Sequence, residues 1–158
     1  MAKVLGLDQS TNKTGWSWFV DNAYIESGVI DKSHIKKDID KRTGEMGTEI
    51  CNMIAEYQPD LVVIENVQAQ SGVATVIALA RLQGFILGWC YVHKIRTEII
   101  APSTWRSLLH FKQGAGVKRK ELKQQSIDYI KNKYGMDLSE DEAESCCLNY
   151  AAHLKYNM

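Results

Sequence analysis

The sequence predicts one α/β domain over residues 1–158, built on a mixed five-stranded sheet flanked by helices. Three observations indicate this class. Short apolar runs end in polar or turn-forming residues, as buried strands do. Two strand-like segments near the N-terminus are joined by a tight turn, which predicts an antiparallel hairpin. Longer segments with apolar residues three and four apart alternate with the later strands, which is typical of a parallel core covered by helices.

The N-terminal segment is predicted to supply three strands. Residues 3–7 (KVLGL) are mostly apolar and end at Asp8, as expected of a buried strand. Residues 15–20 (GWSWFV) and 24–30 (YIESGVI) flank a turn at residues 21–23. They predict a hairpin that follows the first strand.

A helix and a fully covered strand come next. Residues 38–42 are charged and are expected in a loop or at a helix start. One helix face is then marked by apolar residues at Met46, Ile50, Met53, Ile54 and Tyr57. Pro59 is expected to end this helix. The run LVVI at residues 61–64 ends in Glu65 and is typical of a strand covered on both faces.

The segment from Gly72 to Val92 is predicted to be one long apolar helix. Its 21 residues include a single charge, Arg81, and a single amide, Gln83, so its length alone permits a membrane span. However, Arg81 near the centre would cost about 2.5–3.5 kcal/mol on insertion. We therefore expect no membrane, and a helix packed on a sheet or on a second subunit. Gly84 and Gly88 would let another backbone approach one face closely.

The C-terminal half completes the domain. Its expected elements are a strand over residues 97–101, a short helix through His110 and two longer helices over residues 118–134 and 140–155. Pro102 is expected to close the strand, and Ser103 with Thr104 to cap the short helix. Residues 114–116 (GAG) predict a flexible break before the first long helix.

Composition and charge are those of an ordinary globular protein. Lys plus Arg and Asp plus Glu both number 19, so the net charge is zero, and 45% of the residues are hydrophobic. These values argue against disorder and, on average, against a uniformly cationic nucleic-acid binder. The four cysteines lack C-x-x-C spacing, which fits neither a disulfide framework nor a zinc site. Because the N-terminus does not resemble a signal peptide, a cytosolic location is expected.

Four carboxylates stand out by their positions. Asp8 and Glu65 each end a predicted strand, while Asp141 and Glu144 lie near the start of the last helix. Simpler roles exist, since Asp8 can cap a turn, Glu65 can end a solvated strand, and acids in a first turn favour the helix dipole. These roles leave unexplained why Asp141 and Glu144 share one helix face with no cation following before Lys155.

A cation held between these carboxylates would remove their repulsion. Four carboxylates without a nearby His or Cys pattern form an all-oxygen donor set, which selects Mg²⁺ or Mn²⁺. Two such ions about 3.5–4 Å apart can activate a water and stabilise the leaving oxygen in phosphodiester cleavage. The spacing therefore supports the hypothesis of two Mg²⁺ ions per active site, with Mn²⁺ as the alternative.

Opposite charges are concentrated side by side near the C-terminus. Residues 102–134 contain eight basic and two acidic side chains, a net charge of +6, whereas residues 137–144 contain five acidic and no basic ones. A lysine-rich segment usually forms a solvated helix face. Nevertheless, a carboxylate centre bordered by cations is what a nuclease acting on a phosphate backbone requires. The net charge of zero thus hides two local blocks.

Five motifs occur in a characteristic order along almost the whole chain: GLDQSTNKTGW, VIEN, APSTWR, GAGVKRKEL and SEDEAESCCLNYAAH. Together they resemble the RuvC-type Holliday junction resolvases, particularly bacteriophage-like members. Each motif is weak alone, but the ordered set is specific. The resemblance implies an RNase H-like fold, a homodimer, and Mg²⁺-dependent symmetrical nicking of four-way DNA junctions.

The resemblance also implies roles for individual residues. The family's metal-binding acids match Asp8, Glu65, Asp141 and Glu144, of which the last is commonly Asp in the family. The family's catalytic basic residue best matches Lys120, with Lys118 as the neighbouring candidate. Contacts with DNA are expected from Gln68, Gln70, Arg106, Lys112, Lys118, Arg119, Lys120 and Lys123.

Gln68 marks a departure from the family pattern. Members often carry an aromatic wedge three residues after the strand-end glutamate, where it opens the junction centre, and Gln68 stands at that position. We therefore do not expect this protein to open the junction by stacking. We expect it to act on a broader range of branched DNA substrates. The implied homodimer would form through the apolar helix from Gly72 to Val92.

Three other functions are compatible with parts of the sequence. A ribonuclease H acting on RNA–DNA hybrid shares the fold and the metal chemistry. A catalytically silent DNA-binding module shares the fold, but four retained acids would weaken its affinity for DNA. The segment GLDQSTNKTG also resembles the first phosphate loop of sugar kinases and actin-like proteins. Those proteins need a second phosphate loop and an adenosine-binding lobe, and hence a much longer chain than 158 residues.

Overall fold

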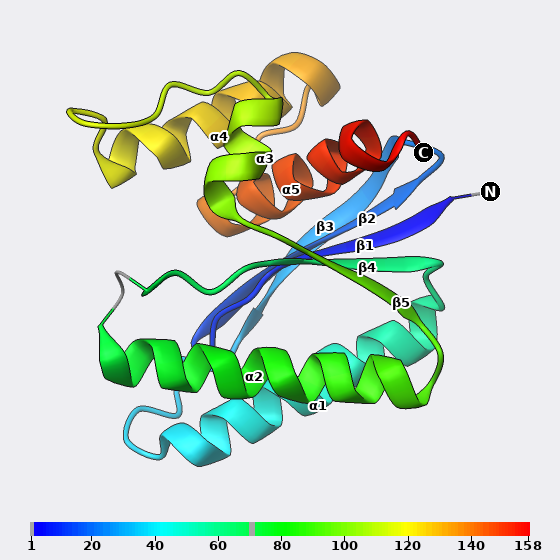
Figure 1. Ribbon diagram of the computed structural model, residues 1–158, viewed down its shortest axis with the longest axis vertical. Helices are drawn as coiled ribbons and strands as arrows, with labels where there is room; N and C mark the ends of the chain where they lie inside the picture. The colour runs from blue at the N-terminus through cyan, green and yellow to red at the C-terminus, as the bar shows by residue number, and fades with distance from the viewer. Residues whose placement is uncertain (1, 70–71) are drawn as a thin grey trace.

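A computed structural model describes residues 2–69 and 72–158, and its centre is a mixed five-stranded sheet (Figure 1). The strands are β1 (Lys3–Asp8), β2 (Lys13–Val20), β3 (Ala23–Asp31), β4 (Leu61–Glu65) and β5 (Arg96–Ile100). They lie in the order β3-β2-β1-β4-β5. β1, β2 and β3 are antiparallel neighbours, whereas β1, β4 and β5 run parallel. The predicted sheet is confirmed.

The β2–β3 hairpin turns where the sequence predicts it. Asp21 and Asn22 both have positive φ, 49° and 65°, and two such residues in succession give the turn whose twist matches that of a hairpin. Asp and Asn tolerate this left-handed conformation better than most residues. The hairpin strands are slightly longer than predicted, because β2 already begins at Lys13.

Helices cover both faces of the sheet (Figure 1). One layer contains α1 (Ile39–Tyr57) and α2 (Val73–Val92), and the other contains α3 (Pro102–Leu108), α4 (Arg119–Tyr134) and α5 (Glu140–Tyr156). Side chains of β4 alternate between the two layers, so Val63 joins the core under α5 while Val62 and Ile64 join the core over α1 and α2. This explains why the LVVI run contains no polar residue.

One helix start agrees with expectation and another differs from it. Residues 38–42 do form a helix start, because the Asp38 side chain accepts a hydrogen bond from the backbone N–H of Lys41 at 2.9 Å. The predicted capping of α3 by Ser103 and Thr104 is wrong. Pro102 occupies the first turn, where its fixed φ favours helix initiation, and no side chain caps it. The helix also ends at Leu108, short of His110.

Buried polar contacts fix α5 on β1 and β2. Ser145 Oγ donates a hydrogen bond to the Gly6 carbonyl oxygen at 2.9 Å. Asn149 Nδ2 donates to the carbonyl oxygens of Val4 and Ser17 at 3.1 and 3.2 Å. Because buried polar groups must be paired, these contacts define how far α5 sits along the strands.

Gly15 lets the start of α5 approach the sheet. A Cβ atom at Gly15 would lie 2.1 Å from the carbonyl oxygen of Asp141. Any residue other than glycine would therefore clash with the backbone of α5. Gly15 is also the residue of β2 that pairs with Asp8 of β1. The first turns of α5 are therefore held against the β1–β2 pair at the level of Asp8.

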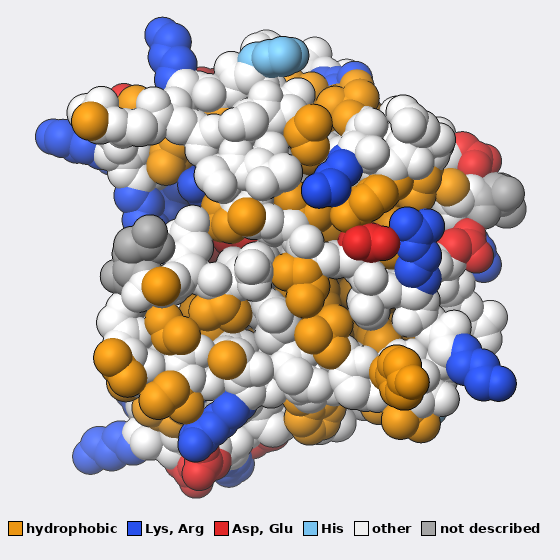
Figure 2. Space-filling view, in the orientation of Figure 1, with side chains coloured by type: hydrophobic (Ala, Val, Ile, Leu, Met, Phe, Trp, Pro, Cys, Tyr) orange, Lys and Arg blue, Asp and Glu red, His pale blue; other side chains and the backbone are white. Residues whose placement is uncertain are grey.

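Helix α2 carries much of the exposed apolar surface of the described residues. Among the described residues it is the one helix with the length and apolar composition to cross a membrane, a weak indication when it stands alone. Its buried side chains are Leu82, Ile86 and Cys90, whereas Tyr91 and Val92 are 86% and 74% exposed. Figure 2 shows hydrophobic side chains gathered over the face on which α2 lies.

Candidate active site

Three of the four predicted acidic residues converge at one edge of the sheet. Asp8 ends β1, Glu65 ends the parallel neighbour β4, and Glu144 lies in the second turn of α5. One carboxylate oxygen from each lies within 4.8 Å of those of the other two. The carboxyl ends of parallel strands share an edge where ligands collect in α/β proteins.

The fourth acid, Asp141, lines the same cavity but is not one of the three whose oxygens meet. It lies one turn before Glu144 on α5. Its negative charge contributes to the raised pKa values of Asp8 and Glu144, after the larger effect of burial. The structure thus places Asp141 beside the cluster.

Burial and mutual repulsion disfavour the charged form of these carboxyl groups. The pKa of Asp8 is raised well above its usual value, first by desolvation and then by neighbouring carboxylates. Burial followed by the charge of Glu144 raises the pKa of Glu65 to about 7. The pKa of Glu144 is also raised by burial, against the opposing effect of Arg106. None of the three forms an ion pair within the described residues, so their donor chemistry fits a divalent cation.

Trp105 holds Glu65 in place. The indole Nε1 donates a hydrogen bond to Glu65 Oε2 at 2.7 Å, and the Trp105 side chain is fully buried. Its ring packs edge-on against Phe111, with centroids 5.7 Å apart. The hydrogen bond fixes the orientation of one carboxylate in the cluster. Sequence reasoning missed this contact, although the APSTWR motif placed Trp105 directly after a strand that neighbours β4.

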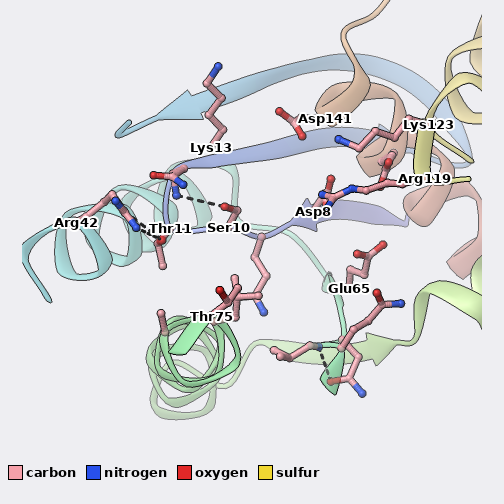
Figure 3. A pocket seen from close by; sticks show the side chains of 18 of the residues that line it. Asp8, Ser10, Thr11, Lys13, Arg42, Glu65, Thr75, Arg119, Lys123 and Asp141 are labelled. Atoms are coloured by element: carbon pink, nitrogen blue, oxygen red, sulfur yellow. Dashed lines mark hydrogen bonds between the residues drawn. The ribbon is translucent and has the colours of Figure 1, made fainter. Parts of the chain in front are cut away.

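Three cationic side chains border the carboxylates. Arg106 of α3 lines the cavity. Arg119 and Lys123 of α4 line it as well (Figure 3). Arg106 Nε is buried without a hydrogen-bond partner in the described residues, and its guanidinium lies 5.1 Å from the centroid of the Trp105 ring. Lys123 forms an ion pair with Glu140 at 3.0 Å.

Lys118 and Lys120 are not among the residues that line this cavity. Helix α4 begins at Arg119, with Lys118 as its N-cap, and Lys120 is exposed. Ile130 is fully buried on the inner side of α4. Lys123 lies seven residues before Ile130, and Arg119 four residues before Lys123, so all three share one side of the helix. The structure therefore favours Arg119 and Lys123 over Lys118 and Lys120 as the cations of α4 beside the carboxylates.

The other predicted DNA-contacting residues have different surroundings. Gln68 is exposed and lines the cavity near Glu65. Lys112 is exposed in the loop before α4, and its backbone N–H and carbonyl both bond the Gln125 side chain, at 2.8 and 3.0 Å. Gln70 lies outside the described residues.

The cavity, of about 780 Å³, continues beyond the carboxylates along the β1–β2 turn. This part is lined by Ser10, Thr11, Asn12 and Lys13 and by Arg42 of α1. Figure 3 shows Arg42 beside Thr11, across the cavity from Arg119. Sequence reasoning missed Thr11, Lys13 and Arg42, and the one signal was the likeness of GLDQSTNKTG to a phosphate loop.

Comparisons with known proteins relate this chain to one family. The family model described as crossover junction endodeoxyribonuclease RuvC matches residues 4–127. A relative of that name from Rickettsia akari is 24% identical over 155 residues, which is 96% of both chains. Another from Caldicellulosiruptor saccharolyticus is 32% identical over 106 residues, which is 63% of both. Both relatives are bacterial, so they do not support a bacteriophage-like member.

Solved structures share the fold. RuvC from Thermus thermophilus in complex with Holliday junction substrate matches with a TM-score of 0.76 at 12% identity, covering 98% of this chain and 94% of that one. The Fowlpox virus resolvase, in complex with Holliday junction DNA, matches with a TM-score of 0.66 at 19% identity, covering 99% of both chains. These neighbours have the RNase H-like fold that the motifs implied. By the family model, this chain belongs to the RuvC family of crossover junction endodeoxyribonucleases.

Proposed function

We propose that the cavity around Asp8, Glu65 and Glu144 is the active site of a Holliday junction resolvase, which nicks four-way DNA junctions by metal-assisted phosphodiester hydrolysis. Family membership supports the reaction and the substrate. The convergence of the three buried carboxylates is the observation that supports the site. Carboxylates this close, buried and without ion pairs are costly for a protein that only binds DNA.

The carboxylate oxygens suit Mg²⁺, with Mn²⁺ as the alternative, because both prefer oxygen donors. Asp8, Glu65 and Glu144 would hold the metal, and Asp141 at the rim would complete a set for two ions. When bound, these ions would polarise the scissile phosphate and lower the pKa of the attacking water. In this proposal the four carboxylates hold the ions in position and neutralise their positive charge.

The cations around the carboxylates are suited to the phosphate itself. Arg106 lines the cavity and forms no ion pair with the described residues, so its guanidinium is available to a phosphate oxygen. Arg119 and Lys123 add positive charge from α4. We assign to these three residues the role of holding the scissile phosphate and stabilising the negative charge that grows on it. Lys112, Lys118 and Lys120, further out, would contact the DNA arms.

A homodimer through α2 would supply two such sites for paired nicks. The exposed side of α2 carries an apolar stripe at helical spacing, formed by Val73, Ile77, Ala80, Gly84, Gly88 and Tyr91. A Cβ atom at Gly84 or Gly88 would meet nothing within 4 Å in one protomer, so a second helix has room to approach. This stripe favours a second copy over a membrane, because Arg81 is also exposed on α2.

The cell's DNA is the expected substrate, and the cytosol is the expected location. All four cysteines are free and buried, as in a reducing compartment.

Because Gln68 stands where an aromatic wedge is common, we expect the enzyme to accept flaps and other branched DNA beside the four-way junction.

The test is cleavage of end-labelled substrates by the purified protein with Mg²⁺. We expect nicks in four-way junctions, weaker cutting of flaps, and little or none in duplex DNA or RNA–DNA hybrid. Asp8→Asn should lower the rate by at least about 10²-fold, because it removes a metal-binding charge. Cutting confined to the hybrid would replace the resolvase by a ribonuclease H, and an Asp8→Asn variant as fast as wild type would disprove the site.

A further inference from the structure

The half of the cavity formed by the β1–β2 turn has no role in the reaction proposed above. It is lined by Thr11, Lys13 and Arg42, which lie on the opposite side of the carboxylates from α4 (Figure 3). Two groups of cations therefore border one acidic cluster within a single cavity. This arrangement raises the question of which ligand the second group would bind.

Arg42 carries a positive charge that no carboxylate neutralises within the described residues. Its Nε and Nη2 donate to Thr11 Oγ1 at 3.2 and 3.1 Å, and its Nη1 donates to the Ile35 carbonyl oxygen at 3.1 Å. Both acceptors are neutral. Since a guanidinium has five N–H donors, at least two remain for a ligand in the cavity. The group is thus held in place while its charge stays available.

Thr11 is oriented by the same contacts. Its side chain is buried, with 5% of the residue exposed, and its hydroxyl oxygen accepts two hydrogen bonds from Arg42. A hydroxyl has two lone pairs and one hydrogen, so the hydrogen is the part left to donate. An anion in the cavity can accept from both Thr11 and Arg42.

The turn that carries these groups is fixed before any ligand binds. The backbone N–H of Ser10 donates to Thr14 Oγ1 at 3.1 Å, and the Thr14 hydroxyl donates to the Ser10 carbonyl oxygen at 2.8 Å. The N–H of Asn12 donates to Ser10 Oγ at 3.2 Å. Such preorganisation reduces the entropy lost on binding.

A buried amide closes the floor of the cavity beside this turn. Gln9 is 8% exposed, lines the cavity, and has no hydrogen-bond partner for its Oε1 atom in the described residues. Its Nε2 donates to Gln83 Oε1 at 3.0 Å. Because this oxygen can only accept, a water molecule could pair with it but a phosphodiester could not.

We infer that Thr11, Lys13 and Arg42 form a second phosphate subsite, which holds a backbone phosphate of the cleaved DNA strand on the side of the scissile phosphate opposite α3 and α4. This inference rests on the proposed function. Every nucleotide carries a phosphate, so a strand with its scissile phosphate at the carboxylates places further phosphates on both sides of it. One flank of the strand leaves on the α3–α4 side, where Arg106, Arg119 and Lys123 hold the scissile phosphate, and the other flank passes the Arg42 side.

The test measures junction binding by fluorescence anisotropy with Ca²⁺ replacing Mg²⁺, over a range of salt concentrations. The variants are Arg42→Gln and Lys13→Gln. The matched control is Lys41→Gln, which removes the neighbouring charge on α1 from a side chain that is 63% exposed and pairs with Glu45. We expect Arg42→Gln to weaken binding roughly tenfold and to reduce the slope of log K against log salt by about 1. Lys13→Gln should act in the same direction, and Lys41→Gln should stay near wild type.

A scan of neutral methylphosphonates along the cleaved strand locates the contact. One substituted position close to the cleavage point should weaken binding by wild type and Lys41→Gln, but not by Arg42→Gln, because that variant has already lost the contact. If Arg42→Gln misfolds, Lys13→Gln decides, since Lys13 is exposed and its single ion pair, with Asp31 at 4.0 Å, is weak.

Wild-type salt slopes for both variants, with no phosphate position coupled to Arg42, would overturn the inference. Failure of the proposed function has a different signature, because wild type itself would then not nick or prefer the junction. In that case the same variant comparison on whichever DNA wild type binds still tests the phosphate subsite.

Discussion

Among single residues, Trp105 has the clearest effect on the site, because its indole donates a hydrogen bond to Glu65. The hydrogen bond of 2.7 Å between Trp105 Nε1 and Glu65 Oε2 selects one orientation of this carboxylate. It also partly opposes burial and the charge of Glu144, which together raise the pKa of Glu65 to about 7. Hydrogen-bond partners that orient a metal ligand contribute to metal affinity although they do not touch the metal. Trp105 is thus a positioning residue, because it acts on the reaction through Glu65.

Trp105→Phe is expected to weaken metal binding by about 10–100-fold while the fold remains. Phenylalanine keeps most of the packing against Phe111 but cannot donate a hydrogen bond. Mn²⁺ titration of the DNA-free protein, followed by electron paramagnetic resonance, measures the affinity directly. Nicking should then recover as the Mn²⁺ concentration is raised.

The matched control is Trp18→Phe, which removes the same atoms from a buried tryptophan on β2. The Trp18 indole makes no hydrogen bond to the described residues, and its ring packs on Tyr57 instead. Equal Mn²⁺ affinities for the two variants and wild type would show that the indole N–H has no positioning role.

At the scale of helices and strands, the elements with a clear apolar pattern could be predicted from the sequence. The strands β1 and β4 follow from apolar runs because both faces of the sheet are covered, and their shared edge follows from a parallel pairing. This is why the sequence could anticipate the meeting of Asp8 and Glu65. The start of α3 was mistaken because Ser103 and Thr104 match the capping preference, while Pro102 before them already satisfies the needs of a first turn.

The rotation of α4 about its own axis decides which of its cations face the carboxylates. The match to the family motif pointed to Lys120, yet Arg119 and Lys123 line the cavity. Buried Ser126 and Ile130 mark the inner side of α4, and the apolar spacing was visible in the sequence. By contrast, the contact between Thr11 and Arg42 joins two residues 31 positions apart in the sequence, and no local pattern indicates it.

Gly84→Glu tests the element proposed to form the dimer. Glutamate is a better helix former than glycine by up to about 1 kcal/mol, and a Cβ atom at Gly84 meets nothing within 4 Å in the protomer. The monomer fold should therefore persist, while a charge in the α2–α2 contact should shift the sedimentation mass at micromolar concentration from dimer to monomer.

Gly44→Glu is the control for that experiment, because Gly44 is also a helical glycine, on α1, where an added Cβ atom would meet nothing within 4 Å. It should leave the dimer intact. A wild-type protein that sediments as a monomer, or a Gly84→Glu variant that remains dimeric, would place the contact elsewhere or remove it.

At the scale of the whole molecule, the buried carboxylates of the active site lower the free energy of unfolding when they are charged and no metal is bound. In the metal-free protein the pKa of Glu65 is about 7, above the ordinary value of 4.5. Between these two pH values the folded state binds more protons than the unfolded state. Stability from this group is therefore full below about pH 4.5 and is lost as the pH rises to 7, after which the loss is constant.

Glu65→Gln removes this loss, because an amide does not titrate and can still accept the Trp105 hydrogen bond. Without metal at pH 8, we expect the variant to exceed wild type in free energy of unfolding by on the order of 1–3 kcal/mol, given about 1.4 kcal/mol per pKa unit. Near pH 4.5 the two should be nearly equal. Urea unfolding at both pH values measures the difference, and Glu56→Gln, at an exposed position on α1, should show none of it.

Metal should reverse that order at pH 8. Saturating Mg²⁺ stabilises a folded protein that binds it by RT ln(1 + [Mg²⁺]/Kd), and wild type retains the full donor set whereas Glu65→Gln does not. Wild type should therefore gain stability with Mg²⁺ and the variant should gain little, while its nicking activity is lost. If Mg²⁺ stabilised both equally, or if their unfolding free energies ran parallel with pH, the buried carboxylates would not be the metal site, and their repulsion would have to be relieved by something other than a cation.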